Sequence, residues 1–128
     1  MSAVSPAALL RHREPALLLG AVDLFDGLTL HCSALGTGPW RWPEMLEAAA
    51  QAAGLLVGLQ PGGLDNTAVI AEYRGVAVHA PDHRGSLRLV AALERRILRF
   101  WRCRFEARAS DGTVLLEGRV TVAPARAG

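Results

Sequence analysis

Glu47 and Gln51 are the two polar side chains of this 128-residue chain that are best placed to do chemistry. They lie in the stretch EMLEAAAQAAGLLVGL, which follows Pro43 and has strong helix formers and no breaker before Gly54. Residues four apart share one face of a helix. Because Glu44 is the only other polar residue in this stretch, we expect a buried helix on which a carboxyl group could act as an acid or a base.

Both residues also have plainer interpretations. Glu47 could be a first-turn acid that complements the helix dipole, as Glu44 would be. Gln51 could be a polar residue that satisfies buried backbone groups. The sequence leaves these structural roles open beside the catalytic ones.

A second acid–base group would have to come from one of four histidines. His31 precedes the predicted helix but lies inside a predicted strand, so only a particular strand register would bring it to Glu47. The plainer role of His12, near the start of the chain, is structural, and His79 and His83 flank a predicted surface turn. His31 is therefore the candidate base within this chain.

The elements that must position these residues are one helix and six β-rich segments. An Asp26-Gly27 turn predicts a hairpin from the first two segments. In the segment from 99 to 109, apolar and charged residues alternate as in a half-buried strand, and a change of phase predicts a bend at 98–100. The β-rich segments are 16–25, 28–35, 67–79, 86–95, 99–109 and 113–122.

The order β-β-α-β-β-β-β predicts an α+β fold, in which a curved antiparallel sheet wraps around one long apolar central helix. We expect a single domain over residues 1–128, with 1–5 and 124–128 as frayed termini.

Composition excludes several classes of partner. The net charge is +2, and all 14 basic residues are arginine without a dense basic stripe, so no nucleic acid is expected. No apolar run reaches the roughly 18–20 residues of a membrane span and the start lacks a signal-peptide layout, so we expect a cytoplasmic protein with no membrane partner. Cys32 and Cys103 lack metal-ligand spacing and are expected to be small buried hydrophobes. No metal and no cofactor is expected.

Three stretches carry a family resemblance: LRHREPALLLGAV at 10–22, LEAAAQAAG at 46–54, and SLRLVAAL with FWRCRFEARA within 86–109. In that order they resemble the opening motif L-P-H-R-x-P-x-L-L-x-D-R-V, the catalytic-helix segment and the last long strands of the 3-hydroxyacyl-acyl-carrier-protein dehydratases of fatty-acid and polyketide synthesis. A shorter-looped branch associated with aryl-polyene pigments is the nearer match. The resemblance covers roughly residues 9–123 and implies a hotdog fold.

The resemblance places Glu47 on the family's catalytic acidic residue and Gln51 on its glutamine, as polar support. It implies a substrate held as an acyl thioester on the phosphopantetheine of an acyl carrier protein. It also implies a site formed between two protomers, and so a homodimer or a heterodimer.

The chain departs from the family in the loop before the helix. There the family carries H-F-P-G, whose histidine works with the acidic residue across the dimer interface, whereas this chain has GTGPWRWP at 36–43 without histidine. Gly20 also stands where the family has aspartate. The histidine could be replaced by His31, could be supplied by a histidine-containing hotdog paralogue in a heterodimer, or could be unnecessary, as in hotdog thioesterases that use a helix-borne carboxylate.

Three functions follow. The first is a dehydratase-like enzyme, or its histidine-lacking subunit, acting on carrier-bound 3-hydroxyacyl chains; the second is an acyl thioesterase; the third is a non-catalytic subunit that binds a carrier protein or stabilises a partner.

An arginine cluster that includes Arg99, Arg102 and Arg104 could dock an acidic carrier protein, or could be a solvated strand face. Trp40 and Trp42 could cap an acyl channel or the dimer seam, or could staple the shortened loop to the core. For both sets the plainer interpretation stays open.

Overall fold

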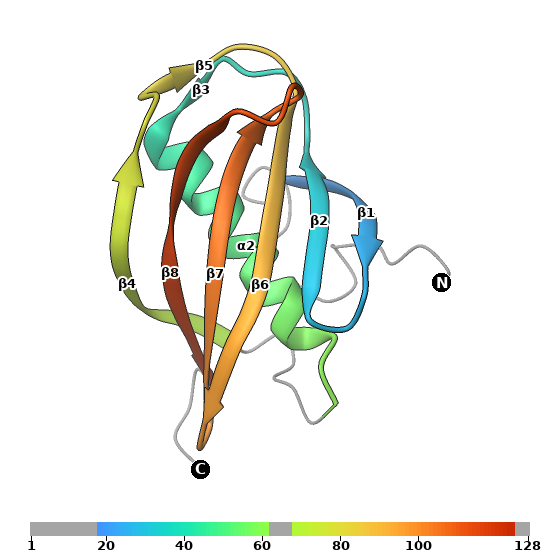
Figure 1. Cartoon of the computed structure of the whole chain (residues 1–128), viewed down its shortest axis with the longest axis vertical. Coiled ribbons are helices and arrows are strands. Elements are labelled where there is room, and N and C mark those ends of the chain that lie inside the picture. Colours follow the sequence, from blue (N-terminus) through green and yellow to red (C-terminus); the bar gives the residue numbers. More distant parts are fainter. Residues whose placement is uncertain (1–17, 62–67, 125–128) are drawn as a thin grey trace.

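A six-stranded antiparallel sheet packed against one helix makes up most of the computed structural model, which describes residues 18–61 and 68–124 (Figure 1). The strand order is β1-β2-β6-β7-β8-β4, and β3 and β5 form a separate two-stranded pair. The α+β class and the curved sheet around a helix are as the sequence predicts. In chain order the elements are β1 (Leu19–Phe25), β2 (Thr29–Ala34), β3 (Trp40–Arg41), α2 (Trp42–Gly58), β4 (Ala68–Val78), β5 (Asp82–His83), β6 (Leu87–Ile97), β7 (Phe100–Ala109) and β8 (Val114–Pro124).

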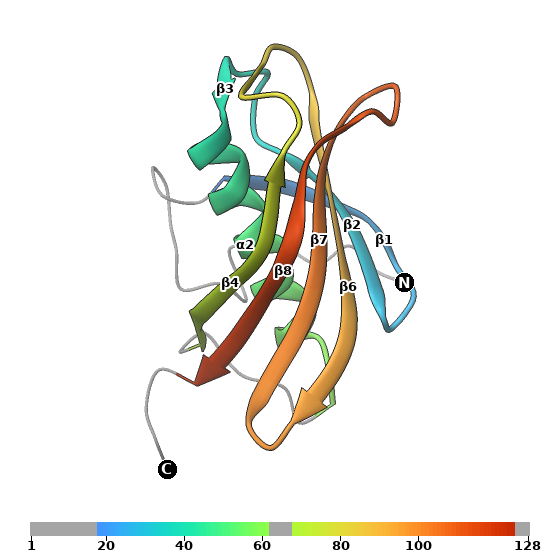
Figure 2. The same ribbon diagram turned by 60° about the vertical axis from the view of Figure 1, so that its left-hand side comes forward.

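The sheet curves around α2 (Figure 2). On the long central strands alternate side chains are apolar and belong to the core between sheet and helix. In β2, Leu30 and Cys32 are buried on this inner face. In β7 the inner face holds Trp101, Cys103 and Phe105, while Arg104 between them is exposed on the outer face, away from α2. The core therefore lies between the inner face of the sheet and the helix.

Helix α2 begins where Arg41 N–H donates to the Glu44 carboxylate, N to Oε1 3.0 Å, with Pro43 in the first turn. Along its length small residues are fully buried, among them Ala48 and Ala52, so strands of the sheet can approach closely. Gly54 does not end the helix, which continues to Gly58. One long, apolar, buried helix is confirmed.

The predicted bend between β6 and β7 is a two-residue loop, Leu98 and Arg99. A register shift between Leu93 and Arg95 changes the phase of the alternation, and Leu98 has a positive φ of 55°. Strands β3 and β5 were not predicted because two residues carry no periodicity. The predictions for residues 1–5, for His12 and for residues 125–128 fall outside the described residues.

Cys32 and Cys103 are buried and free, and burial raises the pKa of each thiol to about 12. They behave as the small buried hydrophobes that the sequence predicts. Within residues 18–61 and 68–124, no helix combines the length and the apolar character needed to cross a bilayer.

Candidate functional site

Glu47 and Gln51 lie one turn apart on α2 and are joined by a hydrogen bond. Gln51 Nε2 donates to Glu47 Oε1 over 3.4 Å, and Gln51 Oε1 accepts from the backbone N–H of Leu18 over 2.8 Å. Gln51 is 4% exposed and is the one buried polar residue of the described chain, whereas Glu47 is half-buried. Gln51 therefore satisfies a backbone group, as its plainer interpretation requires, and also contacts the Glu47 carboxylate.

Tyr73, on the edge strand β4, is a site residue that sequence reasoning missed. It stands opposite the buried Val120 of β8 and therefore shares the inner face of the sheet. Its phenol pKa is raised, first by burial and then by the negative charge of Glu47. Tyr73 is the sole tyrosine of the chain, but no spacing in the sequence relates it to Glu47; only the strand register does.

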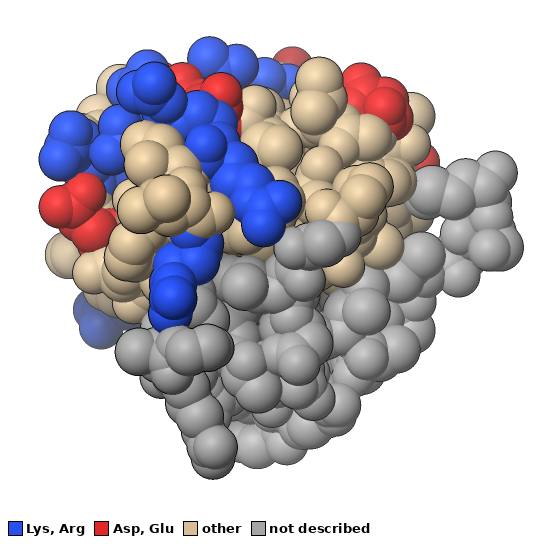
Figure 3. Space-filling model, turned by 90° about the horizontal axis from the view of Figure 1, so that it is seen from below, with Lys and Arg blue, Asp and Glu red and all other residues tan. Residues whose placement is uncertain are grey.

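The arginine cluster lies away from this site. Arg104 is exposed on the outer face and stands opposite Arg119, whose Nε donates to Glu94 over 2.8 Å. Arg99 and Arg102 belong to the tip of the β6–β7 hairpin. Figure 3, which looks at that end of the molecule, shows the basic atoms gathered along one side of it. The structure does not bring these arginines and Glu47 together.

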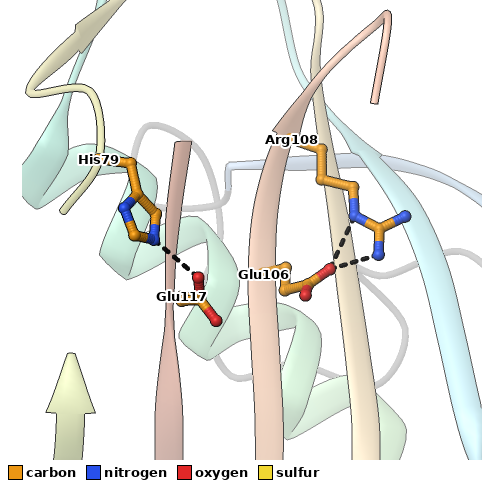
Figure 4. Close-up of polar contacts among 4 residues, drawn as sticks. All are labelled: His79, Glu106, Arg108 and Glu117. Atoms are coloured by element: carbon orange, nitrogen blue, oxygen red, sulfur yellow. Dashed lines mark hydrogen bonds and ion pairs between the residues drawn. The ribbon is translucent and has the colours of Figure 1, made fainter. Parts of the chain in front are cut away.

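His31 and His79 both lie on the outer face of the sheet, away from α2. His31 alternates with the buried Leu30 and Cys32, so it occupies the outer face opposite Val90. The register that would bring His31 to the helix is thus not the one observed. His79 Nε2 lies 2.7 Å from Glu117 Oε2, on the outer face (Figure 4).

The outer face is a charged surface. Glu106 and Glu117 stand directly opposite each other on β7 and β8, and each has its own basic partner, Arg108 for Glu106 and His79 for Glu117 (Figure 4). The charge of Arg108 offsets part of the repulsion between two like charges in register, and His79 gives Glu117 a hydrogen-bond partner. Each of these two acids therefore has a basic side chain of the same chain beside it.

The two tryptophans of the shortened loop have different environments. Trp40 is 5% exposed, and its Nε1 donates to the Gly85 carbonyl over 3.2 Å, so it fastens the loop to the segment after β5. Trp42 is 43% exposed in the first turn of α2. Trp42, and not Trp40, is open to a second molecule.

A hollow of about 500 Å³ lies at the start of α2, one turn before Glu47. Two arginines and two acids balance in its lining, so its charge favours neither an anion nor a cation. Among the described residues, no group of His, Cys, Asp and Glu could hold a metal ion. The lining residues are Pro39, Arg41, Glu44, Asp82, His83 and Arg84.

Solved structures resemble this arrangement over most of the chain. The dehydratase heterocomplex ApeI:P from Xenorhabdus doucetiae superposes with a TM-score of 0.79 at 21% identity, covering 94% of this chain and 91% of that one. The E. coli PaaI protein from the phenylacetic acid degradation operon gives 0.66 at 13% identity, covering 80% of each chain. A Haemophilus influenzae thioesterase gives 0.64 at 11% identity, covering 80% of this chain and 76% of that one. The chain has the hotdog fold. No family model and no curated protein matches the sequence.

In this hotdog chain the candidate site lies at an open edge. Strand β4 ends the sheet, and no described strand pairs with its other side. Ala71, Glu72, Tyr73 and Arg74 are exposed in succession along it. An unpaired row of backbone N–H and C=O groups can receive another strand. Glu47 and Tyr73 thus stand where a second chain could complete the site.

Proposed function

We propose that this hotdog chain is the histidine-lacking subunit of a dehydratase-like heterodimer that acts on 3-hydroxyacyl thioesters bound to an acyl carrier protein. The observation that carries the proposal is the Leu18–Gln51–Glu47 hydrogen-bond chain on a buried helix beside the open edge β4. The loop GTGPWRWP at 36–43, which has no histidine where the resembling family carries one, favours a partner that supplies it. The similarity to a structure described as a dehydratase heterocomplex supports the same choice.

The proposed reaction removes water across the Cα–Cβ bond of the acyl chain. The partner's histidine takes the Cα proton, the C–H electron pair forms the double bond, and the Cβ–O bond breaks. The carboxyl group of Glu47 gives a proton to the departing hydroxyl, which leaves as water. Gln51 holds the Glu47 carboxyl in place through the bond from Nε2 to Oε1.

The partner's position follows from the edge strand. A strand of the second hotdog chain would pair with the free side of β4, and its residues would then face Tyr73 and Glu47. This arrangement would enclose a half-buried carboxylate and exclude water from the reacting atoms. An acyl chain would lie along the seam between the two chains.

A direct test mixes this chain with a hotdog paralogue that carries the histidine loop, adds a carrier-bound 3-hydroxyacyl substrate, and follows the carrier by mass spectrometry. Loss of one water is expected from the mixture and not from either chain alone. E47Q should lower the rate at least about a hundredfold, while E44Q, which changes the same charge one turn earlier, should leave it unchanged. Full activity of E47Q in a stable heterodimer would overturn the proposal.

A thioesterase is the second candidate, because a helix-borne carboxylate can hydrolyse a thioester without histidine and a similar structure is described as a thioesterase. The same assay separates the two functions. Release of free acid by this chain alone would support the thioesterase. If the carrier's mass changes under neither condition while the paralogue still binds, the non-catalytic partner role replaces both.

A further inference from the structure

The tip of the β6–β7 hairpin presents an apolar side chain that the fold does not explain. Leu98 is 84% exposed and has a φ of 55°. In a two-residue hairpin loop, a positive φ at the first position alone is the geometry of a type II′ turn, which normally has glycine there. A leucine in this conformation is strained and, being exposed, gains little packing in return. Leu98 is therefore not the residue that a stable turn of this type favours, which is glycine.

Two more apolar side chains continue this surface. Ile97 and Phe100 stand opposite each other at the ends of β6 and β7, next to the loop, and are 45% and 42% exposed. Figures 1 and 2 both show the hairpin extending past the end of α2. The apex of the molecule at this end is thus a narrow, convex, apolar surface.

Arginines flank this apex on both faces of the hairpin. Arg95 and Arg102 stand opposite each other on the outer face, and neither forms an ion pair with a described residue. On the inner face the Arg96 guanidinium lies 4.4 Å from the centre of the Trp101 ring. With Arg99 in the loop, the tip carries four arginines, and Figure 3 shows basic atoms next to uncharged residues at this end.

We propose that this hairpin tip, defined by residues 95–102, binds the surface of a membrane that contains anionic lipids. Leu98, Ile97 and Phe100 enter the boundary between headgroups and acyl chains, and the arginines behind them contact lipid phosphates. The apolar side chains at the end of the tip match the acyl region of a bilayer, and the arginines behind them match its headgroup region. Long basic side chains can bury their stems while their charge stays among the headgroups. A peripheral contact of this kind needs no spanning segment.

An acidic protein could also bind the four arginines, but the shape of the hairpin tip argues against a protein partner. A protein that recognised the arginines would have to bring its acids into contact with them, but the convex apolar apex stands in front. A fluid lipid surface accommodates a convex wedge, whereas a protein partner would need a matching cavity. The apex and the charges together therefore favour lipid.

The test is co-sedimentation of the full chain with vesicles of phosphatidylcholine alone and of phosphatidylcholine mixed with phosphatidylglycerol. Binding is expected only to the anionic vesicles and should weaken with added salt. R99Q and R102Q should each reduce partitioning about fivefold, whereas R88Q, which removes the same charge farther along β6, should not.

L98G is the decisive variant, because glycine suits the positive φ and the protein should fold at least as well. It should lose most vesicle binding, while L28G, at the exposed Leu28 of the β1–β2 turn, should keep it. Equal binding to neutral and anionic vesicles, or undiminished binding of L98G, would overturn the proposal. So would vesicle-independent binding to an acidic carrier protein that L98G abolishes, because the tip would then be a protein-docking surface.

Discussion

Tyr73 stands opposite Val120 across β4 and β8, and this pairing puts its phenol on the same side of the sheet as the Glu47 carboxylate. The two residues come from the edge strand and the central helix, which are neighbours only because the sheet curls around α2. Burial raises the pKa of the Tyr73 phenol, and the negative charge of Glu47 raises it further.

Replacing Glu47 should therefore change the titration of Tyr73. E47Q removes a negative charge that opposes ionisation of the phenol, so the pKa of Tyr73 should fall, while burial, the larger cause, keeps it above the ordinary value of 10.0. Because Tyr73 is the sole tyrosine, the long-wavelength absorbance band of tyrosinate, where thiolates do not absorb, reports on it alone during an alkaline titration. E44Q serves as the control. An unchanged midpoint in E47Q would show that the two groups do not interact.

The buried amide of Gln51 should contribute to stability independently of any reaction. Q51M keeps a similar volume but leaves the Leu18 N–H without its acceptor, which should lower the free energy of unfolding by about 1–3 kcal/mol. E47Q leaves that bond in place and should change stability much less. Urea unfolding of both variants measures the difference, and equal losses would mean that the bond to Leu18 contributes little.

The sequence predicts the helix and the long strands because their apolar residues recur with clear periods over many residues. It also predicts Gln51 as a buried polar group, since an amide on an all-apolar helix must find partners nearby. Strand register is harder to foresee. Leu30 and Cys32 fix which face of β2 is buried, so the placement of His31 on the outer face follows from alternation once the inner face is known.

Tyr73 and the hairpin tip could not be predicted for a different reason. The position of Tyr73 depends on which strand ends the sheet and on two register shifts in β4. No local sequence pattern predicts either feature. The loop at Leu98 lacks the glycine that is typical of a two-residue hairpin turn. The change of phase in the alternation of apolar and charged residues therefore indicated a bend, but not the type of turn. Residues that break a local rule are the ones that sequence reasoning misses.

The two buried thiols should make the protein sensitive to alkali. Their pKa values are raised to about 12 in the folded state, against 9.0 for an ordinary cysteine, so the folded state holds its thiol protons more tightly than the unfolded state. Below pH 9 the thiols are protonated in both states and the free energy of unfolding has its full value. Between pH 9 and about 12 the unfolded state loses its thiol protons first, which lowers the free energy of unfolding by up to about 4 kcal/mol for each thiol. C32A and C103A should each flatten the decline in the free energy of unfolding over this range, measured by urea titration at several pH values. A decline that is equally steep without either thiol would point to other groups.

Gly118 should not tolerate a side chain, because β8 passes close to β4 and β7 there. A Cβ at this position would lie 3.0 Å from Phe105 Cζ and 3.1 Å from Val76 Cα. The phenyl ring can turn aside, but the contact at Val76 is with backbone, and the pairs Arg74–Arg119 and Ala77–Glu117 hold β4 to β8 on either side of it. G118A should therefore lower the free energy of unfolding by about 1–3 kcal/mol, and adding F105L should restore only part of the loss. G20A is the matched control, because its Cβ would meet nothing nearer than Leu35 Cδ2 at 3.4 Å and should change thermal unfolding little. Full rescue of G118A by F105L would mean that the ring alone, and not the β4 backbone, sets the limit at this position.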